Sequence, residues 1–270
     1  MTIISPALII YQPMDITAIA LQSGSNGNCI YVEAGGVKLL FDAGINGRQA
    51  ETRLAAHGRD IRRVDAVIIS HDHFDHVRHA GVYQRKYGLP LYITRKTYDT
   101  AVKRHPLGKL NDVRFFRSDG MLQFGGVSVE AVATPHDASD SAAFVISSDS
   151  KRLGIMTDLG HIFDGLSEVV CSLDAVFIES NYDPDMLETG LYPAFLKKRI
   201  KGPEGHLSNI EAAELLKATA GKRLKWACLS HLSEQNNSSA LALQTHRDIL
   251  QQDLTLYIAD RYASTPPLFI

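Results

Sequence analysis

A single stretch, SHDHFDH at residues 70–76, most constrains what this chain can form. It directly follows the apolar run VII and places three histidines and two aspartates in seven positions. The pattern predicts a buried strand that ends at this run and a helix that begins at His76, so the stretch occupies a strand-to-helix loop. In such a loop His71 and His73 can turn toward one point while the last aspartate and histidine reach a neighbouring one. Imidazole and carboxylate together suit Zn²⁺, Mn²⁺ or Fe, so we expect a metal site here.

Later apolar runs end on residues of the same ligand type. His136 follows the run VSVEAVAT, Asp158 follows RLGIM in the stretch GIMTDLG, and His231 follows KWACLS. One such residue alone is commonly a turn or capping residue, and a polar surface loop is the simplest alternative for any single histidine. Because the placement recurs at three predicted strand ends, we expect these side chains to complete the metal site.

The remaining chain combines strand-like and helix-like patterns. Runs of β-branched and aliphatic residues predict strands, and apolar residues at three- and four-residue spacing predict helices. The predicted strands are 16–21, 29–34, 37–44, 64–70, 89–94, 127–134, 142–148, 152–158, 173–180, 225–230 and 254–259, and the predicted helices are 47–58, 76–88, 97–105, 209–221 and 238–252. This order predicts an α/β fold with helices covering the sheets. We expect a single domain over 14–270 and an N-terminal extension at 1–13.

Composition and charge exclude several classes of protein. The 28 basic and 30 acidic residues give a net charge of −2, so any binding of a polyanion must be local. The three cysteines are Cys29, Cys171 and Cys228, without a CxxC motif, and an odd number fits poorly with a disulfide framework. The N-terminus lacks a basic region before its apolar run, and no stretch reaches the roughly 20 apolar residues that span a bilayer. We therefore expect a cytoplasmic protein that does not bind membranes.

The motifs together resemble those of the metallo-β-lactamase superfamily, which combines an HxHxDH loop with a later His, a bridging Asp and a final His. The resemblance begins near Met14 and includes LLFDAG with Asp42, a position that is usually structural in this superfamily. It implies a metallo-β-lactamase-type αβ/βα four-layer sandwich with two divalent metal ions per chain, Zn or Mn and possibly Fe. By this resemblance one metal is bound by His71, His73 and His136, the other by Asp75, His76 and His231, and Asp158 bridges them.

Five further stretches are similar to the YycJ (WalJ) subfamily, described as metal-dependent exonucleases acting on DNA. They are SGSNGNC, TDLGH, IESNYD, YPAFLKKRIKGPEGHLSN and HLSEQNNSSALA. Tyr182 in IESNYD stands where this family leads us to expect His, so we assign it no catalytic part, and His161 in TDLGH receives no role. The resemblance implies a phosphodiesterase or exonuclease that acts on single-stranded DNA or nucleic-acid ends through a metal-bound hydroxide, with Asp75 orienting the hydroxide.

A basic segment precedes His206. Its cationic residues are Lys197, Lys198, Arg199 and Lys201. They are candidates to contact backbone phosphates, with a solvated helix end as the alternative. His206 is a candidate to donate a proton to the leaving oxygen, and a hydrogen bond that orders the loop is the alternative. The segment from Asp158 to His231 is too short for the clamping insertion that RNase J carries, so we expect single strands or ends to be preferred to long duplex.

Two other functions fit the same residues. Superfamily membership does not fix a reaction, so a hydrolase of a small thioester, lactone or cyclic nucleotide is the main enzymatic alternative. A non-catalytic protein whose metal site serves folding is the second alternative, although a structural site rarely needs an open position. No obligate protein partner is inferred from the sequence.

Overall fold

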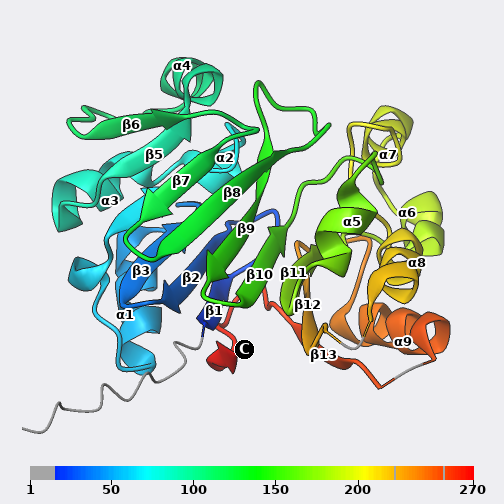
Figure 1. The fold of residues 1–270 in the computed structure, drawn as a ribbon. Coiled ribbons are helices and arrows are strands. Elements are labelled where there is room, and N and C mark those ends of the chain that lie inside the picture. The colour runs from blue at the N-terminus through cyan, green and yellow to red at the C-terminus, as the bar shows by residue number, and fades with distance from the viewer. Residues whose placement is uncertain (1–15, 222, 252) are drawn as a thin grey trace, which may run out of the picture.

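Two β-sheets pack face to face, and helices cover the outer face of each sheet (Figure 1). The computed structural model describes residues 16–270 apart from 222 and 252, so the predicted extension at 1–13 lies outside the described residues. The strands are β1 (Thr17–Gln22), β2 (Cys29–Ala34), β3 (Val37–Phe41), β4 (Ala66–Ile68), β5 (Leu91–Thr94), β6 (Val113–Phe116), β7 (Met121–Phe124), β8 (Val127–Ala133), β9 (Ala142–Ser148), β10 (Lys151–Met156), β11 (Ala175–Glu179), β12 (Trp226–Ser230), β13 (Thr255–Ile258) and β14 (Leu268–Phe269). The helices are α1 (Gly47–Ala56), η1 (Ile61–Arg63, a 3-10 helix), α2 (Phe74–Val77), α3 (Ala80–Tyr87), α4 (Arg95–Arg104), α5 (Leu166–Cys171), α6 (Pro184–Thr189), α7 (Ala194–Ile200), α8 (Asn209–Thr219) and α9 (Ser239–Leu250).

In each sheet, a set of parallel strands ends at one edge, which we call the functional edge. The first sheet has the order β14-β1-β2-β3-β4-β5-β6, and the second has the order β13-β12-β11-β10-β9-β8-β7. Strands β3 to β6 are parallel in the first sheet, as are β10 to β13 in the second. The carboxyl ends of parallel neighbours lie at the same edge of a sheet, so the loops that follow them gather there.

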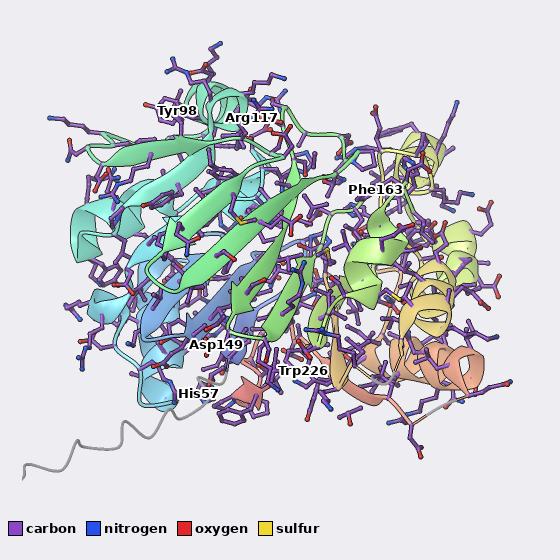
Figure 2. All side chains as sticks on the ribbon, in the orientation of Figure 1. His57, Tyr98, Arg117, Asp149, Phe163 and Trp226 are labelled. Atoms are coloured by element: carbon purple, nitrogen blue, oxygen red, sulfur yellow. The ribbon has the colours of Figure 1, made fainter. Side chains whose placement is uncertain are left out.

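The space between the sheets is filled by apolar side chains from both. Phe41 of β3 and Phe144 of β9 touch across it with ring centroids 5.2 Å apart. Trp226, labelled in Figure 2, packs its ring against Phe177 at 5.4 Å and donates its indole N–H to the Phe269 carbonyl at 2.9 Å. Burial of each such large apolar side chain contributes about 1.5–3 kcal/mol to the free energy of folding. The two sheets are thus joined into one core behind the functional edge.

The central strands, such as β1, are apolar on both faces because both faces are covered. In β1 the side chains of Ala18 and Ala20 face the other sheet, whereas Ile19 and Leu21 pack in the core that the first sheet forms with its helices. A third core lies between the second sheet and α5, α8 and α9. This four-layer arrangement confirms the predicted αβ/βα sandwich.

The predicted elements are recovered with one correction that affects the site. The helix predicted over 76–88 is two helices, α2 and α3, which break at His79, where the backbone N–H bonds to the Ala43 carbonyl at 3.0 Å instead of continuing a helix. His73 precedes α2 as its cap, so Asp75 and His76 lie on a short helix and not in the loop. The sequence patterns did not predict β6, β7, β14, α5, α6 or α7, which are short.

Two further observations concern the cysteines and the helices. None of the three cysteines, all of which are described, is paired: Cys29 and Cys228 are buried and Cys171 is exposed. Across 16–270, leaving aside 222 and 252, no helix has both the length and the apolar character needed to cross a membrane.

Gly44 brings the end of β3 against the loop that carries the metal-ligand motif. Its backbone N–H donates to the Asn28 carbonyl at 2.9 Å, and the Asn28 N–H donates to the Asp75 carbonyl at 2.8 Å. A Cβ atom at Gly44 would lie 1.6 Å from the Asp75 carbonyl oxygen and 2.5 Å from the Asn28 nitrogen. Both contacts are with backbone, which cannot rotate away, so glycine is required for this approach.

We expect Gly44→Ala to destabilise the chain by about 2 kcal/mol or more, because the added methyl group forces the Asp75 segment to move. Urea unfolding measures the change. Gly126→Ala is the matched control, since a Cβ at Gly126 meets nothing within 4 Å, and its effect should stay within about 0.5 kcal/mol. Equal stability of the two variants would contradict the close approach.

Candidate metal centre

Imidazoles and carboxylates from both sheets converge at the functional edge. They form four overlapping groups, in each of which the ligand atoms all lie within 4.8 Å of one another. The groups are His71, His73 and His136; His71, His76 and Asp158; Asp75, His76 and His231; and Asp158, Glu179, His206 and His231. The structure therefore brings together all seven predicted metal ligands and adds Glu179 and His206 to them.

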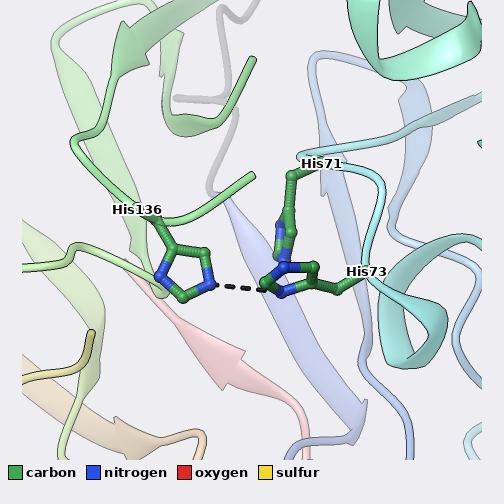
Figure 3. A group of neighbouring side chains, drawn as sticks. All are labelled: His71, His73 and His136. Atoms are coloured by element: carbon green, nitrogen blue, oxygen red, sulfur yellow. Dashed lines mark hydrogen bonds between the residues drawn. The ribbon is translucent and has the colours of Figure 1, made fainter. Parts of the chain in front are cut away.

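The first group consists of three imidazoles whose rings point toward one another (Figure 3). The Nε2 atom of His136 lies 3.3 Å from the Nδ1 atom of His73. The remaining nitrogens of these two rings are held from behind, since His136 Nδ1 lies 2.9 Å from the Gly205 carbonyl and His73 Nε2 lies 3.2 Å from the Asp137 carbonyl. Carbonyl acceptors fix the tautomer of each ring and leave the facing nitrogen with a free lone pair, as a metal ligand requires.

The group of Asp75, His76 and His231 is built around Asp75 on α2. Its Oδ2 atom lies 3.4 Å from the Nε2 atoms of both His76 and His231 and accepts a hydrogen bond from Asn28 Nδ2 at 3.1 Å. His76 donates from Nδ1 to the buried Asp42 carboxylate at 2.7 Å, which orients its Nε2 toward the group. Asp42 also accepts from the Ser70 N–H at 2.8 Å, so this usually structural position supports a ligand.

Asp158 lies between the three-histidine group (His71, His73 and His136) and the group built around Asp75. Its Oδ1 atom is 3.6 Å from His136 Nε2 and 3.6 Å from His231 Nδ1, and its Oδ2 atom is 3.4 Å from His76 Nε2. Both oxygens are buried without a hydrogen-bond partner among the described residues, and so is His71 Nε2. Leaving such atoms unsatisfied is costly, and a cation is the partner that a carboxylate and a row of imidazole lone pairs share. The donors therefore fit a divalent-metal centre.

Three residues of the centre or its support have left-handed backbone conformations. They are Asp42, with φ of 65°, Asp158, with φ of 55°, and His231, with φ of 57°. This conformation is uncommon for residues other than glycine and costs of order 1–3 kcal/mol each unless the surroundings impose it. Each of the three follows the end of a strand, so the backbone turns sharply there and directs the side chain into the cluster.

Burial and the neighbouring carboxylates shift the pKa values of the clustered histidines in opposite directions. Burial lowers the pKa of His71, His73 and His136, which favours neutral imidazoles. For His231 burial acts in the same direction, but the carboxylates of Asp158 and Asp75 outweigh it and raise the pKa to about 10. A protonated imidazole cannot bind a metal, so loading this centre near neutral pH displaces protons from the residues that carry a raised pKa.

Glu179 and His206 form a pair at the edge of the cluster. Glu179, the last residue of β11, is fully buried and accepts hydrogen bonds from His206 Nδ1 at 2.6 Å and from the Leu159 N–H at 3.0 Å. Burial acts to raise the pKa of Glu179, but the imidazoles of His206 and His231 outweigh it and hold that pKa well below its usual range. Glu179 was not among the predicted site residues, although its position at a strand end is the same signal that identified Asp158.

Three residues near the motifs face away from the cluster. Asp72 is buried and accepts from Arg104 at 3.0 Å and from the Ser139 N–H at 2.8 Å, so it ties the loop to α4 and to the segment after β8. Tyr182 packs in a small apolar group with Leu187 and Ile200. The ring of His161 lies 2.6 Å from the Pro203 carbonyl and orders the loop before His206.

The basic segment lies on and just after α7, beside the cluster. Arg199 forms an ion pair with Asp137, whose Oδ1 atom lies 3.5 Å from His73 Nε2. Lys201 pairs with the Glu188 carboxylate at 2.7 Å, and Lys197 donates to the Glu188 carbonyl. Lys198 is exposed, with neither a hydrogen bond nor an ion pair to another described residue. Three of the four cations thus have protein partners.

Comparisons with known proteins cover most of the chain. The profile of the β-lactamase superfamily domain matches residues 38–231. The exodeoxyribonuclease WalJ of Streptococcus pneumoniae serotype 2 is 36% identical over 250 residues, which are 92% of this chain and 93% of that protein. The exodeoxyribonuclease YycJ of Bacillus anthracis is 34% identical over 234 residues, 86% of this chain and 88% of that protein. The solved metallo-β-lactamase fold protein YhfI from Bacillus subtilis matches the fold with a TM-score of 0.71 at 17% identity, over 93% of this chain and 99% of that one.

We expect Asp158→Asn to lower bound divalent metal per chain by about half or more, because the amide removes the negative charge that the central position supplies to both groups. Elemental analysis after gel filtration measures the metal content. Asp174→Asn is the control: Asp174 is also buried, but it accepts from the Arg152 N–H at 2.8 Å, away from the cluster. An Asp158→Asn protein that retains all its metal would contradict the central position.

Proposed function

The chain belongs to the YycJ-like subfamily of the metallo-β-lactamase superfamily, and on that premise we propose that it is a dinuclear metal-dependent exonuclease of single-stranded DNA. The observation that carries the proposal is that two groups of metal-type ligands meet at the Asp158 carboxylate. That arrangement suits a phosphodiester, in which charge develops on an attacking and a leaving oxygen on opposite sides of phosphorus. The names of the relatives from S. pneumoniae and B. anthracis support DNA as the polymer.

We assign the residues to two ions in the way that the resemblance implies. One ion would be held by His71, His73 and His136, the other by Asp75, His76 and His231, with Asp158 between them. Nitrogen and carboxylate donors of this kind accept Zn²⁺ and Mn²⁺ alike, with Fe as a further possibility. When bound, the ions supply Lewis acidity, which lowers the pKa of water and neutralises phosphoryl oxygens.

Asp75 orients the attacking water. Its Oδ2 atom accepts a hydrogen bond from Asn28 Nδ2 at 3.1 Å, so the direction in which the carboxylate accepts a proton is fixed. A carboxylate held in this way reduces the freedom that the water must lose on reaching the phosphorus atom.

His206 delivers a proton to the leaving oxygen. Its Nδ1 atom is engaged by the Glu179 carboxylate, whereas its Nε2 atom has no hydrogen-bond partner among the described residues and belongs to a partly exposed ring. The buried carboxylate fixes the orientation of the ring, as the positioning of a general acid requires. Because Glu179 already bonds both His206 and the Leu159 N–H, we assign the pair to proton transfer and not to metal ligation.

The DNA backbone is contacted by the basic segment. Lys198 is the cation that a phosphate reaches without breaking an existing ion pair, whereas Arg199, Lys197 and Lys201 must first release an acidic or carbonyl partner. A few cations of this kind give modest, salt-sensitive binding, in keeping with single strands or ends as substrates.

The cytoplasm stays the expected compartment, because unpaired cysteines suit a reducing environment.

Protein loaded with Mn²⁺ or Zn²⁺ should shorten end-labelled single-stranded DNA progressively, and Asp75→Ala should not, because the water is no longer oriented. Gel electrophoresis of the products measures this and shows which end is attacked. Asp119→Ala, which removes an exposed carboxylate paired only with Arg117, should digest as wild type does and controls for purification. Intact DNA after incubation with wild-type protein that holds two ions would refute the proposal.

His206→Ala should lower turnover of DNA by about 10²- to 10⁴-fold while metal content stays unchanged, because a general acid is lost. A p-nitrophenyl phosphodiester needs no proton on its leaving group, so its hydrolysis should fall much less. His57→Ala, on the far end of α1, is the matched control. Loss of metal from His206→Ala would make this residue a ligand, and equal losses on both substrates would exclude it as the acid.

A further inference from the structure

An open groove lies on α7 beside the metal-ligand cluster. Its volume is about 400 Å³, within the usual range for a site that holds a small organic group. The residues that matter for its chemistry are Asp137, Phe195, Lys198, Arg199, Pro203 and Glu204. Neither the predicted metal ligands nor the proposed proton transfer uses its apolar surface.

Asp137 joins this groove to the cluster. Its carboxylate lies 3.5 Å from His73 Nε2 and 3.6 Å from His136 Nε2 on one side and pairs with Arg199 on the other. Its backbone N–H donates to the Glu204 carbonyl at 3.0 Å, which fixes the groove wall to the residue that follows His136. A group bound in the groove is therefore separated from the cluster by the thickness of one side chain.

The groove combines an exposed aromatic ring with an unpaired cation. Phe195 is 75% exposed, more than any other phenylalanine among the described residues. Lys198 follows three residues later, so the two side chains project from the same face of α7. The charge of Arg199 is balanced by its ion pair with Asp137, whereas the Lys198 ammonium has no ion pair with another described residue and is available to an anion. A flat neutral group carrying an anionic attachment fits this surface.

We propose that the groove binds an unpaired nucleobase of single-stranded DNA next to the scissile phosphodiester, with the base stacked on Phe195 and the adjoining phosphate at Lys198. Stacking on an aromatic side chain accepts every base, because each presents a π face. A base within a duplex is already stacked and paired, so it does not enter without unpairing, and the groove selects single strands. This inference rests on the proposed function and names the feature of the substrate that the chain recognises.

Binding of an internally labelled single strand, measured by fluorescence anisotropy in the non-cleaving Asp75→Ala background, tests the groove. Phe195→Ala should weaken binding about 5- to 100-fold, and Phe195→Trp should retain it, as expected for loss and retention of one stacked base. Phe269→Ala removes a phenylalanine that is 61% exposed outside the groove and should leave binding unchanged.

Binding of single-stranded DNA that carries one abasic nucleotide, at or next to either terminus, separates the loss of stacking from a general effect of the mutation on folding. If the base contacts Phe195, the abasic position that weakens binding by the intact ring should cause little further loss in Phe195→Ala, because both changes remove the same contact. A penalty that is the same with and without the ring would overturn the proposal. So would a dimer that Phe195→Ala converts to a monomer, since a second copy would then occupy the groove.

The two levels of inference fail in different ways. If wild-type protein holding two ions does not digest single-stranded DNA, the proposed function fails and the groove assignment fails with it. If wild type digests DNA and Phe195→Ala binds it as tightly, the groove assignment alone fails.

Discussion

The buried carboxylate of Asp158 is the constraint around which this edge of the molecule is organised. It lies within 3.6 Å of imidazoles from three separate segments and has no hydrogen-bond partner among the described residues. A charge buried in this way requires compensation, either by protonated histidines or by cations. Both sheets must therefore deliver nitrogen donors to one point, and the segments after β4, β8 and β12 do so. The metal centre follows from the need to satisfy that carboxylate.

The supporting hydrogen bonds determine which ring nitrogen is free. Asp42 engages Nδ1 of His76, the Gly205 carbonyl engages Nδ1 of His136, and the Asp137 carbonyl engages Nε2 of His73. These acceptors follow β3, follow His136 and precede His206, so segments distant in sequence fix the ring orientations together. The close approach of Gly44 to the Asp75 carbonyl shows how little freedom the backbone beneath the ligands has. Rigid backbone and directed rings together preorganise the donors.

Much of the fold and most of the candidate site follow from the sequence, for reasons that also explain what does not. His136, Asp158 and His231 were identifiable because each follows a long apolar run, and a buried strand is the strongest pattern in a chain of this kind. Glu179 occupies the same kind of position, but it is the last residue of its own strand, so it read as part of the run. The role of Asp137 depends on its contacts with α7, and the split between α2 and α3 depends on the Ala43 carbonyl. Contacts between distant segments leave no local pattern.

The groove on α7 and the cluster are joined by the Asp137–Arg199 pair, so recognition and chemistry share one wall of the site. Both the chemistry and the recognition proposed for this edge require that the donors hold two ions with Asp158 between them. Native mass spectrometry of the chain, after loading with Zn²⁺ or Mn²⁺ and removal of excess metal, counts the bound ions. We expect a mass increase of two divalent ions per chain. A chain that retains one ion or none would contradict it.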